Sequence, residues 1–212
     1  MKQAFLFLLI GVAGLIGTEY LLSLQHHQTA QKIAEKAKAS AFSLEKAPTD
    51  SLQGKIATLS GIVNWQSRIA TQPAQIKKPR FIQQGEELRT GKDGTVSVQI
   101  YNGPFLTLLP NSHVNFIQTL PSSIVITQDQ GTVTYRTQGK KVSIESLSLL
   151  TTLNEGIMTV SVDQALDTVA IDVKKGNTTE AYNDSDNRSN VLPVTSGHTF
   201  LFNDDTLTES VE

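Results

Sequence analysis

The chain has 212 residues, of which 39% are hydrophobic and 18% charged, so it is too short for a large multidomain machine and too apolar for a disordered protein. Its 18 Lys and Arg residues nearly balance 20 Asp and Glu residues, which argues against a nucleic-acid partner. Cys is absent, and this removes disulfides, thiol nucleophiles, Cys-based zinc sites and a lipid-modified cysteine anchor.

The first 24 residues have the character of a membrane anchor. Residues 4–24 are 21 residues with only three polar interruptions, and as a helix they span about 31 Å, which matches a hydrocarbon core of about 30 Å. A cleaved secretory signal is the alternative, because a charged start and an apolar run are also typical of one. A type IV pilin start is rejected, since the apolar run here precedes Gly17-Thr18-Glu19 instead of following it.

The orientation of this anchor is set by two opposing signals. Lys32, Lys36 and Lys38 follow the apolar run, and the positive-inside rule alone places the rest of the chain in the cytoplasm. The export-like start and the Thr- and Ser-rich body favour the opposite side. We expect a single-pass protein of the bacterial cytoplasmic (inner) membrane whose C-terminal domain is extracytoplasmic.

Residues 25–50 form the predicted stalk and linker. Ala and a few aliphatic residues recur at helical spacing over residues 30–44, so we expect a solvated spacer helix, with weak self-pairing as the alternative. Pro48 and Asp50 end it and mark the domain boundary. Beyond it, residues 51–150 carry 10 basic and 5 acidic side chains, whereas residues 151–212 carry 3 and 11. We expect an acidic C-terminal tail over 204–212.

Residues 51–203 read as an all-β domain. Alternation with period two recurs in short runs bounded by Gly, Pro, Asn or Asp, as in 95–101, where Val96, Val98 and Ile100 face one side. Asp93-Gly94 and Asn102-Gly103 predict hairpin turns between such runs. Short strands at this spacing predict a sandwich, barrel or β-roll.

The order of these turns resembles the FecR-type domain family over roughly residues 56–202. The positions that carry the resemblance are predicted structural turns at Thr90, Gly91, Asp93, Gly94, Asn102, Gly103, Pro110, Gly131, Gly176 and Gly197. The sequence departs from the family at Gly156-Ile157, where the family has Gly-Thr. The resemblance implies a twisted, solenoid-like, two-layer β domain that is exported and acts through protein contacts. Family members that regulate sigma factors carry a cytoplasmic helical part before the membrane helix; only residues 1–3 precede the apolar run here, so we do not expect a direct hold on a sigma factor.

The sequence contains no residue pattern typical of a catalytic, cofactor-binding or metal site. His26, His27, His113 and His198 lack metal-site spacing, and the segment 183–187 resembles a calcium loop without its Gly and distant Glu. Asp163, Asp167 and Asp172 are the only conceivable glycosidase carboxylates in that region, and strand alternation explains Asp172. We therefore expect a protein that is not an enzyme and binds no cofactor.

Two features are candidates for binding. Lys77, Lys78 and Arg80 form the one dense basic run, in a Pro-flanked segment expected to be a loop, and they suit an anionic glycan, lipid headgroups or an acidic partner. Trp65 is the sole Trp and is expected to pack in the core, with a surface aromatic platform for sugar or protein as the alternative. The leading expectation is a membrane-anchored domain that binds another envelope protein or takes part in envelope signalling. A carbohydrate- or cell-wall-binding module is the main alternative, and a glycan-active enzyme the lesser one.

Overall fold

The structure is a computed structural model that describes residues 45–212. The predicted anchor and residues 25–44 of the predicted stalk and linker lie outside the described residues. Within residues 45–212 no helix is long and apolar enough to cross a membrane. Residues 44–212 form a compact unit of their own, with one contiguous hydrophobic core among the described residues. A fragment of residues 45–212 is therefore suitable for experiments in solution.

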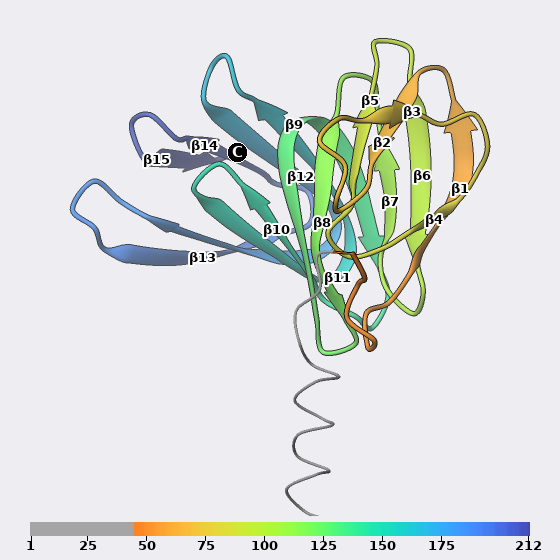
Figure 1. Cartoon of the computed structure of the whole chain (residues 1–212). Coiled ribbons are helices and arrows are strands. Elements are labelled where there is room, and N and C mark those ends of the chain that lie inside the picture. Colours follow the sequence, from red (N-terminus) through yellow and green to blue (C-terminus); the bar gives the residue numbers. More distant parts are fainter. Residues whose placement is uncertain (1–44) are drawn as a thin grey trace, which may run out of the picture. The chain divides into compact units, whose positions relative to one another are not determined.

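This unit is all-β, as predicted, and its strands make one open, mixed sheet (Figure 1). The strands are β1 (Gly54–Ser60), β2 (Val63–Gln66), β3 (Ala74–Gln75), β4 (Phe81–Ile82), β5 (Glu87–Thr90), β6 (Thr95–Ile100), β7 (Phe105–Leu108), β8 (His113–Leu120), β9 (Ser123–Thr137), β10 (Val142–Ser146), β11 (Leu149–Asp163), β12 (Thr168–Asn183), β13 (Ser189–Thr195), β14 (Thr199–Asn203) and β15 (Thr208–Val211). Only β9 and β10 pair in parallel; the other pairings are antiparallel.

The strands pair side by side along two paths through the sheet, which we call routes. Both routes include the three long strands β9, β11 and β12. One route runs β4-β1-β6-β7 and continues through the second halves of β9 and β11 into the first half of β12, then β14 and β15. The other runs β3-β2-β5-β8 and continues through the first half of β9, β10, the first half of β11 and the second half of β12 to β13. Buried residues of both routes belong to one core, in which Tyr135 and Phe116 are the largest fully buried side chains.

Each long strand changes its inward face at a glycine. In β9 the buried residues are Ile124, Ile126 and Gln128 before Gly131 but Val133, Tyr135 and Thr137 after it. The same change of parity occurs in β11 at Gly156 and in β12 at Gly176, where the register with the partner strand shifts. All three glycines have positive φ, of 82°, 134° and 85°. A bulge of this kind turns a strand's side chains over and lets one strand serve two routes.

Two expected turns and one expected hairpin are corrected by the structure. Gly131 and Gly176 lie inside strands, because a positive φ here makes a bulge and not a chain reversal. Asp93-Gly94 does reverse the chain, but the strands on either side, β5 and β6, do not pair with each other and belong to different routes. The Asn102-Gly103 hairpin between β6 and β7 is confirmed, with Asn102 at φ 48°. Gly197 also lies in a turn, between β13 and β14.

The other turn residues lie at the joint between the two routes. The Thr90 hydroxyl donates a hydrogen bond of 2.6 Å to the carbonyl of Leu109 and accepts one of 2.8 Å from the Ser112 amide. Gly91 donates its amide to the Ile62 carbonyl and accepts from the Asn111 amide, next to Pro110. These contacts hold the β5–β6 and β7–β8 connections against each other. The predicted turn residues Thr90, Gly91 and Pro110 therefore stabilise the joint between the two routes.

The acidic segment 204–212 is not a free tail. The Asn203 side chain accepts a hydrogen bond of 2.9 Å from the Thr206 amide and shapes a turn, after which β15 returns beside β14. Thr208 and Val211 suit a strand, and the register sets Val211 opposite Phe200. The C-terminal acidic residues are thereby held at the outer edge of the sheet.

Candidate functional site

The predicted binding residues gather around β4, and Trp65 is the centre of one group. Trp65 is half-buried on β2, and its indole Nε1 donates a hydrogen bond of 3.0 Å to Oε2 of the buried Glu86. The same oxygen accepts a bond of 2.9 Å from the Gln83 amide. The guanidinium of Arg80 lies over the indole ring, 3.3 Å from its centroid. Trp65 is thus fixed at both its polar edge and one face.

This stack changes the interpretation of two predicted residues. Because Arg80 covers a face of Trp65, that face is not open for stacking with a sugar ring, and the guanidinium is engaged in a cation–π contact. Lys77 and Lys78 behave differently, since both are exposed in the connection between β3 and β4. The structure therefore joins Trp65 to Arg80 and leaves the two lysines at the surface.

The stack gives a direct spectroscopic prediction. Replacing Arg80 with Ala uncovers the sole Trp, so we expect its fluorescence emission to shift to longer wavelength and its quenching by acrylamide to increase. The lost cation–π contact should also lower the free energy of unfolding by about 1 kcal/mol. Lys78→Ala, which changes a nearby exposed cation, is the matched control and should leave the emission maximum unchanged. An unshifted spectrum in Arg80→Ala would show that the stack does not persist in solution.

A groove lies on the outer face of β4, β1 and β6, beside these residues. It has a volume of about 780 Å³ and a mainly apolar lining that includes Lys55, Ala57, Pro79, Phe81, Gln99 and Tyr101. We refer to it as the basic groove. The register places Lys55 directly between Phe81 on one side and Gln99 on the other. Phe81 and Tyr101 are 58% and 67% exposed, which is high for side chains of this size.

Basic side chains predominate in the segment that forms most of the basic groove, although the exposed Asp50 directly precedes its lining residue Ser51. From Ser51 to Ile82 the chain carries five basic side chains and no acidic one: Lys55, Arg68, Lys77, Lys78 and Arg80. Lys55 lies in the groove, and Lys78 precedes its Pro79. Sequence reasoning found the 77–80 run, with the adjacent Ile76 or Phe81 as its apolar anchor, but missed Lys55 and Tyr101, because their proximity to Phe81 depends on the pairing of β1 with β4 and β6.

A second charged cluster joins β5, β8 and β9 at the surface. The two ring nitrogens of His113 lie 2.9 Å from carboxylate oxygens, Nε2 from Glu87 and Nδ1 from Asp129. Arg89 also donates to Glu87, at 2.8 Å. Arg89 Nε also lies 3.1 Å from His113 Nε2, and its charge opposes protonation of the ring, but a carboxylate at each ring nitrogen favours the doubly protonated imidazole. His113, which sequence reasoning considered only as a metal ligand or as a surface or turn residue, is therefore the centre of an ion network.

The protonation states in this cluster follow from its contacts. Burial lowers the pKa of His113, but the hydrogen bonds to Asp129 and Glu87 outweigh it, and the pKa is raised above its usual value. Burial raises the pKa of Glu87, yet the bonds from Arg89 and His113 outweigh it, so the pKa is lowered. The bond from His113 lowers the pKa of Asp129.

The cluster predicts a pH window for stability. The raised pKa of His113 means that its contribution is present below pH 6.5, its ordinary value, and is lost as pH rises through the folded-state value. The lowered pKa values of Glu87 and Asp129 mean that theirs is lost as pH falls below the ordinary carboxyl range. His113→Gln should therefore cost about 1 kcal/mol near pH 5.5 and much less above pH 8.5, measured by urea unfolding. An equal loss at both pH values would contradict the ion network.

The remaining polar candidates have structural tasks in the described residues. The Asp163 carboxylate accepts amide hydrogen bonds from Ala165 and Leu166 and shapes the turn after β11. Asp184 does the same for Asp186 and Arg188 in the segment resembling a calcium loop. Within residues 45–212 no three His, Cys, Asp or Glu side chains are placed to hold a metal ion. The pair His26-His27 lies outside the described residues.

Two solved structures share this fold. They are crystal structures, at 2.50 Å and 1.65 Å resolution, of a protein from Parabacteroides distasonis ATCC 8503 provisionally identified as an anti-sigma factor. Both superpose with a TM-score of 0.51, at 13% and 12% sequence identity, over 59% of this chain and 58% of theirs. The chain thus matches less than two thirds of the solved chains. No protein-family model and no curated protein sequence matches it. The likeness supports a FecR-like fold.

Proposed function

We propose that the protein is a single-pass, membrane-anchored envelope protein whose FecR-like body lies outside the cytoplasm, binds another protein and takes part in envelope signalling. The observation that carries this proposal is the shared fold with a protein provisionally identified as an anti-sigma factor. The apolar segment 4–24 and the polar segment 25–50 supply the anchor and the spacer. The proposal assigns no catalytic role and no cofactor to any residue.

The binding surface proposed for the partner is the basic groove. Its apolar walls, Phe81 and Tyr101, are exposed, and Lys55 provides a positive charge directly beside Phe81. A surface of this composition is suited to an acidic protein segment with an apolar side chain. The alternative of a sugar-binding platform at Trp65 is less well supported, since Arg80 covers a face of the indole.

Protease accessibility on intact spheroplasts tests the topology. We expect added protease to digest the body while a cytoplasmic control protein stays intact, and the mass of the mature N-terminus to include Met1. Protection of the body until lysis would place it in the cytoplasm and overturn the proposed location. A mature N-terminus beyond residue 24 would show that the apolar segment is a cleaved signal.

Photocrosslinking tests the groove as the protein-binding surface. A photoreactive amino acid at position 101 should give crosslinks to an envelope protein in living cells, and these should weaken in the Lys55→Glu background. The same group at Val191, which is 63% exposed on the distant β13, is the matched control. Equal crosslinking from both positions would contradict a specific site at the groove.

A further inference from the structure

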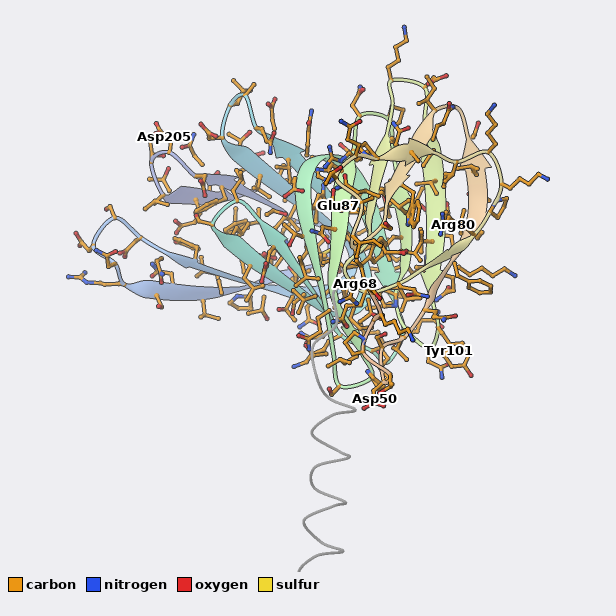
Figure 2. All side chains as sticks on the ribbon, in the orientation of Figure 1. Asp50, Arg68, Arg80, Glu87, Tyr101 and Asp205 are labelled. Atoms are coloured by element: carbon orange, nitrogen blue, oxygen red, sulfur yellow. The ribbon has the colours of Figure 1, made fainter. Side chains whose placement is uncertain are left out.

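The two ends of the first strand route carry opposite charges. The route begins with β4 and β1, in the segment 51–82 that has five basic and no acidic side chains. It ends with β14 and β15, in the segment 199–212 that has four acidic and no basic side chains: Asp204, Asp205, Glu209 and Glu212. We call this second region the acidic edge. Figure 2 shows Arg80 and Asp205 on opposite sides of the body.

The acidic edge is exposed and has an open strand. Within the described residues β15 pairs only with β14, and Thr208 to Val211 are all exposed. Val211, which is 51% exposed, is an apolar side chain next to the exposed carboxylate of Glu212. Asp204 is tied to Ser148 by hydrogen bonds from the Ser148 amide and hydroxyl, and the Glu209 carboxylate interacts with the Tyr182 hydroxyl. The charges that face outward are therefore those of Asp205 and Glu212.

The basic groove offers the complementary set of groups. Phe81 and Tyr101 form apolar walls that suit one aliphatic side chain, and Lys55 in the lining would neutralise a carboxylate beside that side chain. The exposed Lys78, next to Pro79 of the lining, adds a second positive charge in the adjoining segment. Beside the groove, the second half of β1 has β6 on one side and no strand partner on the other, because β4 pairs only with Gly54 and Lys55. An open strand edge of this kind accepts an extended segment.

We propose that the acidic edge of one copy of this chain docks on the basic groove of a second copy. The contact joins two different surfaces, so a bound pair still presents one free groove, on the copy whose edge is docked, and one free edge, on the copy whose groove is filled. Association of this type grows head to tail instead of stopping at a dimer. The proposal goes beyond the function proposed above and does not depend on the membrane anchor, since both surfaces belong to residues 45–212. A second copy and the envelope partner would compete for the same groove, so crosslinks from position 101 to this chain report the copy and crosslinks to another protein report the partner.

Sedimentation of the 45–212 fragment at several concentrations tests the contact. We expect the average mass to rise past that of a dimer as concentration increases at low salt. It should fall back toward the monomer near 0.5 M salt, where the Debye length is only about 4 Å. Lys55→Glu/Lys78→Glu and Asp205→Lys/Glu212→Lys should each weaken association on the order of tenfold or more. Lys140→Glu/Lys141→Glu reverses two charges in the turn before β10 and should leave association unchanged.

Mixing the two charge-reversed variants is the decisive measurement. Each is expected to be monomeric alone, but one retains an intact acidic edge and the other an intact basic groove, so the mixture should form complexes. A wild-type fragment that stays monomeric, or a mixture that does not associate, would overturn the proposal. Thermal unfolding of each variant separates loss of contact from loss of fold. A groove that binds anionic vesicles through Lys55 and Lys78, in a fragment that does not self-associate, would assign the surface to a bilayer instead.

Discussion

Glu180→Gln is expected to stabilise the folded protein by roughly 3 kcal/mol at pH 8, and to have little effect near pH 4.5. Glu180 is fully buried on β12, and burial raises its pKa to about 7 from an ordinary value of 4.5, although a hydrogen bond of 2.5 Å from the Thr151 hydroxyl opposes this. The nearby Thr178 hydroxyl also lowers the pKa of Glu180. Neither Thr178 Oγ1 nor Glu180 Oε1 has a hydrogen-bond partner of good geometry, so burial remains the dominant effect on the pKa.

The sign of this effect follows from proton uptake. Between pH 4.5 and about 7 the folded state holds a proton on Glu180 that the unfolded state has lost, so stability falls as pH rises through this range. At about 1.4 kcal/mol per pH unit, the total loss is roughly 3 kcal/mol, and Gln removes it because it carries no charge at any pH. For a domain of this size the gain at pH 8 corresponds to a rise in Tm of about 10 °C.

Urea unfolding of both proteins from pH 4 to pH 8.5 checks this prediction. The quantity to compare is the difference in unfolding free energy between wild type and Glu180→Gln at each pH, which cancels the contribution of the His113 cluster. It should grow from near zero to its full value by about pH 7. Glu209→Gln, an exposed substitution of the same chemistry on β15, is the control and should show no such growth. Parallel profiles for wild type and Glu180→Gln would show that Glu180 is not buried as a carboxylic acid.

The parts of the fold that depend on local alternation were predictable from the sequence. Val96, Val98 and Ile100 alternate over six residues, and the structure buries all three on β6. The hairpin at Asn102-Gly103 has a local cause in positive φ, and it forms between paired strands. In both cases the residues that carry the sequence pattern lie within a few residues of the strand or turn that the pattern predicts.

The burial of Glu180 was not predictable in the same way. Val169, Ile171 and Val173 bury the odd positions of β12, and continuing that alternation places Glu180 on the outside. The bulge near Gly176 shifts the register by one residue, so the even positions beyond it are buried. The basic groove was missed for a related reason, because Lys55, Phe81 and Tyr101 meet only through strand pairings that no local pattern encodes.

Gly176→Ala is expected to cost about 4 kcal/mol or more of unfolding free energy, or to prevent folding. At φ 85° a side chain is already strained, and a Cβ atom added here would lie 1.9 Å from the carbonyl oxygen of Glu155 on the neighbouring strand. That oxygen belongs to backbone held in the β11–β12 ladder, so it cannot move away as a flexible side chain would. Gly156 pairs with Gly176 on the neighbouring strand, and a Cβ atom added at Gly156 would lie 1.9 Å from the carbonyl oxygen of Lys175.

Gly139→Ala separates the two causes of this loss. Gly139 also has a positive φ, of 69°, but an added Cβ atom would have no atom within 4 Å, so only the backbone strain of about 1 kcal/mol is expected. Urea unfolding of both variants gives the difference, and soluble yield with far-ultraviolet circular dichroism gives the answer if Gly176→Ala does not fold. Equal losses would mean that the strand relaxes without its glycine. A much larger loss at Gly176 would show that the close approach of β11 and β12, which turns both strands from one route to the other, is a requirement of the fold.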